Sequence, residues 1–135
     1  MPEKIYIDGQ YVALLLKGIE TAQRVEFFTD SDDLLQIAAF SMEQKASIQP
    51  HLHLNQERVI NGTHEVLFVQ SGELIVNFYR DKDKNIIEKS VSLGIGDLIY
   101  LRSGIHGFEI GSDCKFLEIK QGPFIDGKDK IKLYS

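Results

Sequence analysis

The sequence contains very little cysteine and no long apolar run. Cys114 is the only cysteine among the 135 residues, so the chain can form neither an internal disulfide nor a cysteine-rich zinc site. A lone cysteine is typical of a protein from a reducing compartment. The longest apolar run, residues 11–16, is far too short to cross a bilayer, and residues 1–4 do not resemble the start of a signal peptide. We therefore expect a cytoplasmic protein with no membrane partner.

Positive charge is also scarce. The 15 Lys and Arg residues are outnumbered by 20 Asp and Glu residues, which gives a formal net charge of -5 at pH 7. Phosphate binding requires a basic face, and no basic cluster is present, so we expect no nucleic-acid partner. The nucleophile elbow, the Walker loop and the dinucleotide glycine fingerprint are absent as well. The enzyme classes that depend on those motifs have no support here.

The sequence does contain apolar residues that alternate with a period of two, which predicts β-strands. Asp8-Gly9 and Ser71-Gly72 each lie between two such runs and predict hairpin turns, and residues 81–85 and 94–97 predict further turns. The expected strands are residues 5–7, 11–16, 24–28, 65–70, 73–80, 86–93, 98–101, 106–110 and 115–121.

Three segments differ from this series. Residues 29–33 are acidic and predict a loop. Residues 34–43 suit either a helix turn or a strand, and the neighbouring strands favour a strand. From residue 122 onward the chain is polar, which predicts a tail laid over the body of the protein or over a partner.

The length predicts one domain, because 135 residues leave little room for a second. No repeat, low-complexity segment, linker or long amphipathic helix interrupts the chain. Roughly nine or ten short strands with regular turns are typical of a sandwich or a barrel. We expect a single all-β domain over residues 1–135, a closed or nearly closed antiparallel barrel with less than about a tenth of its residues in helices.

His51-Leu52-His53 is the first group of residues that indicates chemistry. On a strand, residues two positions apart point to the same face, so both imidazoles can reach one point. Imidazole is the commonest protein ligand for a metal ion. By itself the pair is equally compatible with two surface or core histidines. Pro50 and the polar residues 54–58 place it at a strand end, near a barrel mouth.

Glu65 and His106 add two further donors. Glu65 starts an apolar strand and shares its face with Leu67 and Val69, where an unpaired carboxylate is costly. His106 shares a face with Phe108 and therefore points inward. The simpler interpretations are an exposed glutamate and a core histidine. Four ligand-type residues in these strand contexts favour a metal site instead.

The order of these motifs resembles the cupin superfamily. His-x-His precedes a glutamate with six residues to a glycine, Glu65 to Gly72, and residues 96–101 with His106 look like the second cupin motif. The similarity covers about residues 48–119, and the whole chain looks like small single-domain bacterial cupins of unassigned function. It implies a double-stranded β-helix barrel of the jelly-roll type. In that barrel the carried-over ligands of one divalent metal ion are His51, His53, Glu65 and His106.

The sequence departs from the cupin pattern in places. Eleven residues, 54–64, separate His53 from Glu65 where the family has only a few, so Glu57 is a competing ligand if this insertion folds inward. Lys45 replaces the usual glycine of the first motif, and Arg102 replaces the usual proline of the second. His64 points away from the face of its neighbour Glu65, and we leave it out of the site.

Three functions fit this interpretation. In a metal-dependent enzyme, open coordination positions on Fe, Mn, Ni, Co or Zn would activate water or O₂ or bind a small oxygen-rich substrate. In a metal-free isomerase or epimerase of nucleotide-linked sugars, His51 or His53 would act as base and Tyr79 or Tyr100 as acid. The third is a non-catalytic cupin that binds a small molecule. The full ligand set favours the first function.

The N-terminal strands predict a homodimer. Residues 5–7 and 11–16 are more apolar than the interior of a small barrel requires. Open edge strands pair readily with another chain, and small cupins that resemble this one often pair in that way.

Overall fold

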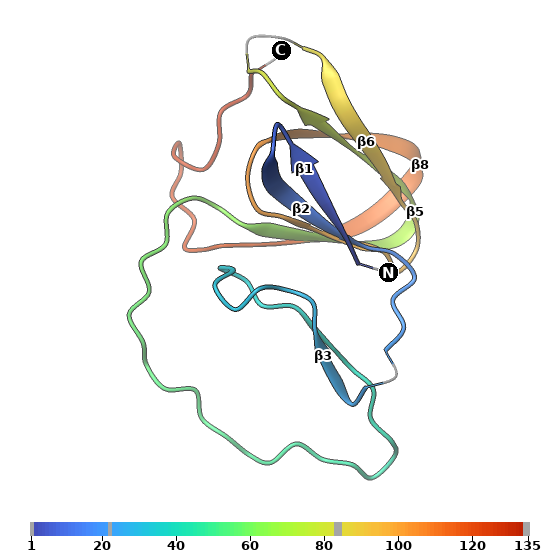
Figure 1. Cartoon of the computed structure of the whole chain (residues 1–135), viewed down its shortest axis with the longest axis vertical. Helices are drawn as coiled ribbons and strands as arrows, with labels where there is room; N and C mark the ends of the chain where they lie inside the picture. The colour runs from blue at the N-terminus through green and yellow to red at the C-terminus, as the bar shows by residue number, and fades with distance from the viewer. Residues whose placement is uncertain (1, 22, 83–84, 134–135) are drawn as a thin grey trace. The chain divides into compact units, whose positions relative to one another are not determined.

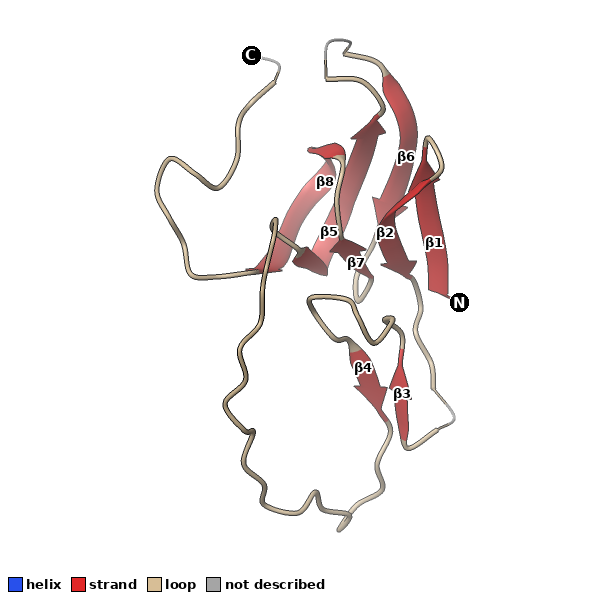
Figure 2. Cartoon of the chain, turned by 60° about the vertical axis from the view of Figure 1, so that its left-hand side comes forward, coloured by secondary structure: helices blue, strands red, loops and turns tan. Residues whose placement is uncertain are grey.

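The computed structural model describes residues 2–21, 23–82 and 85–133, and it contains strands and no helix in those ranges (Figure 2). Nothing in the described ranges could therefore cross a membrane as a helix.

The chain divides into two units: unit 1 comprises Met1–Ile19 and Thr63–Ser135, and unit 2 is Glu20–Gly62. The expectation of one domain over residues 1–135 stays a prediction. The strands are β1 (Pro2–Ile7), β2 (Gln10–Leu16), β3 (Val25–Phe27), β4 (Ala38–Phe40), β5 (Glu65–Tyr79), β6 (Ile87–Leu93), β7 (Leu98–Leu101) and β8 (Ile105–Lys120).

Unit 1 is one antiparallel sheet in the order β1-β2-β7-β5-β6, with β8 paired to β5. The sheet curls into a half-barrel (Figure 1). Its opposite ends come within side-chain reach, since the Lys89 ammonium of β6 lies 3.5 Å from the Glu3 carboxylate of β1. Lys17, just after β2, likewise donates to the Ser92 carbonyl of β6 at 2.9 Å. The all-β class is confirmed.

Most of the core of unit 1 lies on the inner face of this curl, whereas β2 is buried at five successive residues, 12–16, and therefore on both of its faces. On β5, the side chains of Leu67, Val69, Leu74 and Val76 are completely buried. Neighbouring strands add apolar residues to the same cluster, among them Ile5, Val12, Ala13, Leu15, Leu93, Ile99 and Leu101. Burial of this many aliphatic side chains is the main force that holds the sheet curled.

The predicted turn at Asp8-Gly9 is confirmed. Both residues have positive φ, 52° and 77°, and Ile7 pairs directly with Gln10 across the turn. This is the geometry of a two-residue hairpin, whose handedness matches the twist of the strands. The expected strand at residues 98–101 is found with the same bounds as β7. Part of the predicted turn at 81–85 lies outside the described residues, because positions 83 and 84 are not among them.

The predicted hairpin at Ser71-Gly72 is wrong. β5 runs through both residues without reversing, and β8 accompanies it along the same edge. The register shifts on either side of Ser71, so the pair forms a bulge and a bend rather than a turn. Gly72 has φ 79°, and a Cβ at this position would lie 1.9 Å from the Asp113 carbonyl oxygen of β8. Close approach of the two backbones at the bend explains the glycine.

The separate strands expected at 106–110 and 115–121 are also wrong, since both belong to the single strand β8. Gly111, Ser112 and Asp113 look like a turn in the sequence. In the fold they lie beside the bulge of β5, where Glu73 pairs with Ser112. Each strand is therefore irregular at its glycine-containing segment, and irregularities of this kind favour a curled sheet.

Unit 2 is sparsely structured. β3 and β4 form a two-stranded antiparallel ribbon in which Val25 pairs with Phe40. β3 confirms the strand predicted at 24–28, whereas only Ala38–Phe40 of residues 34–43 is a strand. The acidic residues 29–33 form the expected loop. The Asp33 carboxylate closes it by accepting a hydrogen bond from the Asp30 amide at 2.9 Å. No strand follows within unit 2 among the described residues.

Candidate functional site

Glu65 and His106 come together on unit 1. β7 ends at Leu101, directly opposite Glu65 of β5. Only residues 102–105 separate Leu101 from His106, so the short connection carries the histidine back to the glutamate. His106 Nε2 lies 2.9 Å from Glu65 Oε1.

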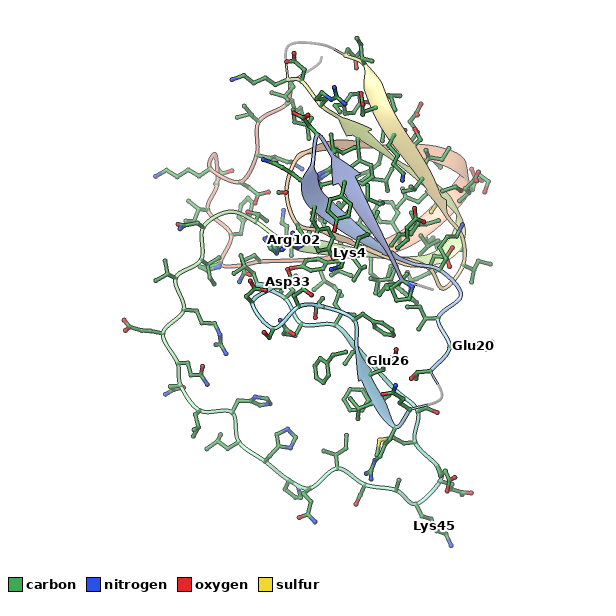
Figure 3. All side chains as sticks on the ribbon, viewed as in Figure 1. Lys4, Glu20, Glu26, Asp33, Lys45 and Arg102 are labelled. Carbon is green, nitrogen blue, oxygen red and sulfur yellow. The ribbon has the colours of Figure 1, made fainter. Side chains whose placement is uncertain are left out.

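The connection between β7 and β8 is held firmly on β2. The Arg102 amide donates to the Val12 carbonyl at 2.8 Å, a bond that proline could not make. The Arg102 guanidinium donates to the Tyr11 carbonyl at 2.8 Å and lies 4.1 Å from the centre of the Tyr11 ring. The Lys4 ammonium lies over the same ring, 4.9 Å from its centre. Figure 3 labels Lys4 and Arg102. These contacts give a physical reason for arginine in place of the proline that the cupin pattern would have.

The Glu65–His106 pair is largely shielded from solvent, with side chains 12% and 27% exposed respectively. The His106 ring stacks on Phe108 with ring centres 5.5 Å apart. His106 lies opposite the buried Phe78 of β5, so it faces inward as predicted. Its Nδ1 atom is buried and has no hydrogen-bond partner among the described residues. The imidazole is thus fixed by one carboxylate and one aromatic ring.

Two charged residues of β8 belong to the same cluster, and the sequence analysis missed them. Lys120 lies directly opposite Glu65, and Glu118 lies opposite Leu67, so both share the inward face of Glu65. Lys120 Nζ is 2.9 Å from the Asp129 carboxylate. The signal in the sequence is the alternation of Phe116, Glu118 and Lys120, but only the strand register places these residues beside Glu65.

The charged groups of this cluster shift one another's pKa. The hydrogen bond from His106 lowers the pKa of Glu65, burial opposes that shift, and a hydrogen bond with Glu118 adds to it. The hydrogen bond with Glu65, together with burial, raises the pKa of Glu118. The Asp129 carboxylate raises the pKa of Lys120. Glu65 is therefore the group that carries the negative charge of the carboxyl pair, and Glu118 is the one that holds a proton more readily.

We expect Glu118→Gln to change how stability depends on pH. The contribution of Glu118, whose folded pKa is raised, is present below the ordinary value of 4.5 and is lost as pH rises through the raised pKa. An amide keeps a donor toward Glu65 at every pH. The variant should therefore gain stability over the wild type at pH 7 and gain little at pH 4, measured by urea unfolding. Glu109→Gln, on the same strand but hydrogen-bonded to Asn77, is the control. An equal gain at both pH values would contradict this assignment.

His51 and His53 lie in unit 2, and the strand expected for them is absent. Residues 46–62 carry no strand, and both histidines are exposed. Leu52 and Leu54, which a strand would place on the face opposite the two histidines, are 85% and 76% exposed. No neighbouring layer covers that face, so a strand here would have nothing to pack against. The two imidazole rings nevertheless lie 5.2 Å apart, and His51 Nδ1 is 2.8 Å from the Gln49 carbonyl. Glu57, the alternative acidic ligand, is exposed in the same segment.

Taken one unit at a time, the described residues contain no group of three or more His, Cys, Asp or Glu side chains arranged to hold a metal ion. The four predicted ligands form two pairs, Glu65 with His106 and His51 with His53. His64 points away from the first pair, because its Nδ1 hydrogen-bonds to the Tyr100 hydroxyl. No protein-family model, curated protein or solved structure matches this chain, and the cupin resemblance stays a prediction.

Proposed function

We propose that this chain is a metal-binding cupin, with a jelly-roll barrel and one divalent ion held by His51, His53, Glu65 and His106. The ion would make it an enzyme that acts on a small, oxygen-rich molecule. The observation that carries the proposal is the Glu65–His106 contact of 2.9 Å on the inward face of the curled sheet. A motif glutamate and a motif histidine lie side by side although 40 residues separate them in the sequence.

The residues present fit a first-row divalent metal. A carboxylate oxygen and an imidazole nitrogen at this separation form a mixed donor set, and such sets bind Fe, Mn, Ni, Co or Zn. Phe108 and the carboxylate fix the ring of His106, which reduces the entropy lost on ligation. The His-x-His motif supplies the other two donors of the proposal, and both of its imidazoles are accessible. When bound, the metal would act as a Lewis acid with open coordination positions.

The residues around the pair suit an anionic or oxygen-rich substrate. Lys120 lies opposite Glu65 and stays cationic, because Asp129 and the two glutamates raise its pKa. Glu118 holds a proton beside Glu65 more readily than an isolated glutamate does, since its pKa is raised. A positive charge to orient the substrate and a carboxyl group to move a proton are what general acid–base chemistry requires.

A metal-free isomerase or epimerase is the second candidate, with His51 or His53 as the expected base. The one observation that favours it concerns His106 instead, because Glu65 contacts this imidazole as a carboxylate orients a catalytic base. The acid of that mechanism is missing from the same face. Tyr79 lies opposite Ile105 while Phe78 lies opposite His106, so Tyr79 and His106 point to opposite faces. Tyr100 alternates with Leu101, the partner of Glu65, and points away as well. A non-catalytic binding cupin remains the third candidate.

Metal analysis of untagged protein separates these candidates. The proposal predicts about one first-row divalent metal ion per chain after dialysis, measured by inductively coupled plasma mass spectrometry. Full activity or ligand binding by metal-free protein would favour the second or third candidate. The lone Cys114 supports the proposed cytoplasmic location.

We also propose a homodimer. β1 stands at one end of the sheet order, and among the described residues no strand pairs with its outer edge. An open edge with apolar residues is a template for pairing with a second chain. Analytical ultracentrifugation should give a mass near twice 15.3 kDa. A monomer whose mass does not change with concentration would contradict this proposal.

A further inference from the structure

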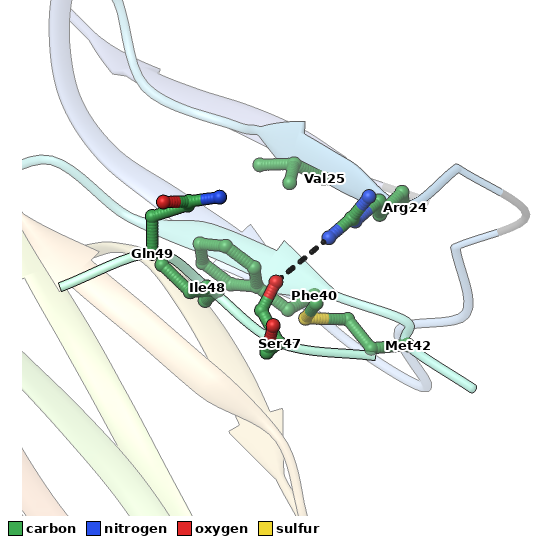
Figure 4. Close-up of a pocket in the computed structure, with 7 residues that line it drawn as sticks. All are labelled: Arg24, Val25, Phe40, Met42, Ser47, Ile48 and Gln49. Atoms are coloured by element: carbon green, nitrogen blue, oxygen red, sulfur yellow. Dashed lines mark hydrogen bonds between the residues drawn. The ribbon is translucent and has the colours of Figure 1, made fainter. Parts of the chain in front are cut away.

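A pocket of ≈ 360 Å³ lies within unit 2 (Figure 4). Three pieces of chain line it: the start of β3, β4 with the residues that follow it, and residues 47–49. The volume falls in the range of small-molecule sites in proteins.

The walls of the pocket are mostly apolar. Val25 and Phe40 are directly opposite each other in the β3–β4 ladder, so their side chains lie on one face of the ribbon. Met42 and Ile48 extend this surface. Phe40 and Ile48 are more than half exposed, so much of their apolar surface meets solvent in the empty pocket. A ligand with an apolar body would remove that surface from water, which is favourable.

One cation stands at the rim of this apolar surface. The Arg24 guanidinium donates one hydrogen bond, to the Ser47 carbonyl at 3.2 Å, as the dashed line in Figure 4 marks. Among the described residues it makes no ion pair, although unit 2 is rich in acids and has only Lys45 and Arg58 as its other Lys or Arg residues. A guanidinium has five N–H donors in a planar fork that suits a carboxylate. Most of these donors remain for a ligand.

We propose that this pocket binds a small monocarboxylate with an apolar body, such as an aromatic acid. The carboxylate pairs with Arg24, and the apolar body lies against Val25, Phe40 and Ile48. Gln49, whose amide lies at the other end of the lining from Arg24 in Figure 4, offers a donor and an acceptor for a second polar group of the ligand. This site does not depend on the proposed metal.

The test compares benzoate with benzyl alcohol, which has a similar apolar body and no charge. Both are titrated into ¹⁵N-labelled full-length protein by NMR, with the amides of Phe40 and Ile48 as reporters. Arg24→Met should weaken benzoate binding roughly tenfold or more, since charge-assisted hydrogen bonds are lost, and leave benzyl alcohol unchanged. Arg58→Met, an exposed arginine of unit 2 that does not line the pocket, is the matched control and should change neither.

A second variant tests the apolar wall. Ile48→Ser should weaken both probes by a similar factor, because it removes apolar surface and leaves the charge in place. Benzoate binding that is unchanged in Arg24→Met would overturn the proposal. So would the absence of saturable binding, or shifts that leave the amides of Phe40 and Ile48 unmoved.

Discussion

Gly72→Ala should destabilise the protein by about 3 kcal/mol or more, the largest effect that we expect from a single methyl group. Two costs add at this position. A left-handed backbone costs roughly 1–2 kcal/mol for a residue with a Cβ, and forcing a group into a packed site costs roughly 1–3 kcal/mol. The new Cβ would lie 1.9 Å from the Asp113 carbonyl oxygen, which belongs to the backbone and cannot rotate away. The measurement is urea unfolding followed by circular dichroism.

Gly96→Ala is the matched control. Gly96 also has a positive φ, 81°, but no atom lies within 4 Å of a Cβ built there. It should therefore lose only the cost of the left-handed backbone, roughly 1–2 kcal/mol. Equal losses in the two variants would show that β5 and β8 do not approach closely at the bend. The glycine of the Glu-x6-Gly pattern would then need another explanation.

His106→Ala should abolish nearly all metal binding, with a loss of affinity of roughly a hundredfold or more. It removes one of the two donors that already lie together and leaves Glu65 without its partner. Ala at His51 or His53 should also remove most of the bound metal. Glu65→Gln should weaken binding less, since an amide oxygen still coordinates but brings no charge. Isothermal titration with Mn²⁺ and with Zn²⁺ gives the affinities.

His64→Ala provides the control for these variants. His64 is adjacent to Glu65 in sequence but hydrogen-bonds to Tyr100 on the other face of the sheet. Its loss should leave metal affinity unchanged. Glu57→Ala tests the competing ligand: metal retained by Glu65→Ala and lost in Glu57→Ala would show that the acidic ligand comes from the inserted segment.

Local pattern was sufficient to predict most strands of unit 1, and it failed where the outcome depended on a distant neighbour. The bounds of β7 and the turn at Asp8-Gly9 follow from alternation and turn chemistry within a few residues. Ser71-Gly72 has the same local features as a hairpin turn. Its role as a bend depends on β8, about 40 residues further along the chain, which pairs with β5 on both sides of it. No local window contains that information.

The candidate site, too, was predictable where local pattern decided the outcome and not where a distant strand decided it. The inward direction of His106 follows from the alternation with Phe108, and its contact with Glu65 from the short connection after β7. Glu118 and Lys120 join the site only through the register of β8 on β5. The strand expected for His51 and His53 rested on the spacing of the two histidines, on the flanking Pro50 and polar residues 54–58, and on the resemblance to cupins. Their segment has neither a paired neighbour nor a covered apolar face, and it forms no strand.

The most direct test of the central claim is anomalous X-ray scattering, measured across the absorption edges of Mn, Fe, Co, Ni and Zn on crystals of the untagged protein. The proposal predicts a single anomalous peak bound by His51, His53, Glu65 and His106, with ligand distances of roughly 2.0 to 2.2 Å. Well-ordered crystals in which His106 keeps its contact with Glu65 and no peak lies beside the pair would contradict it.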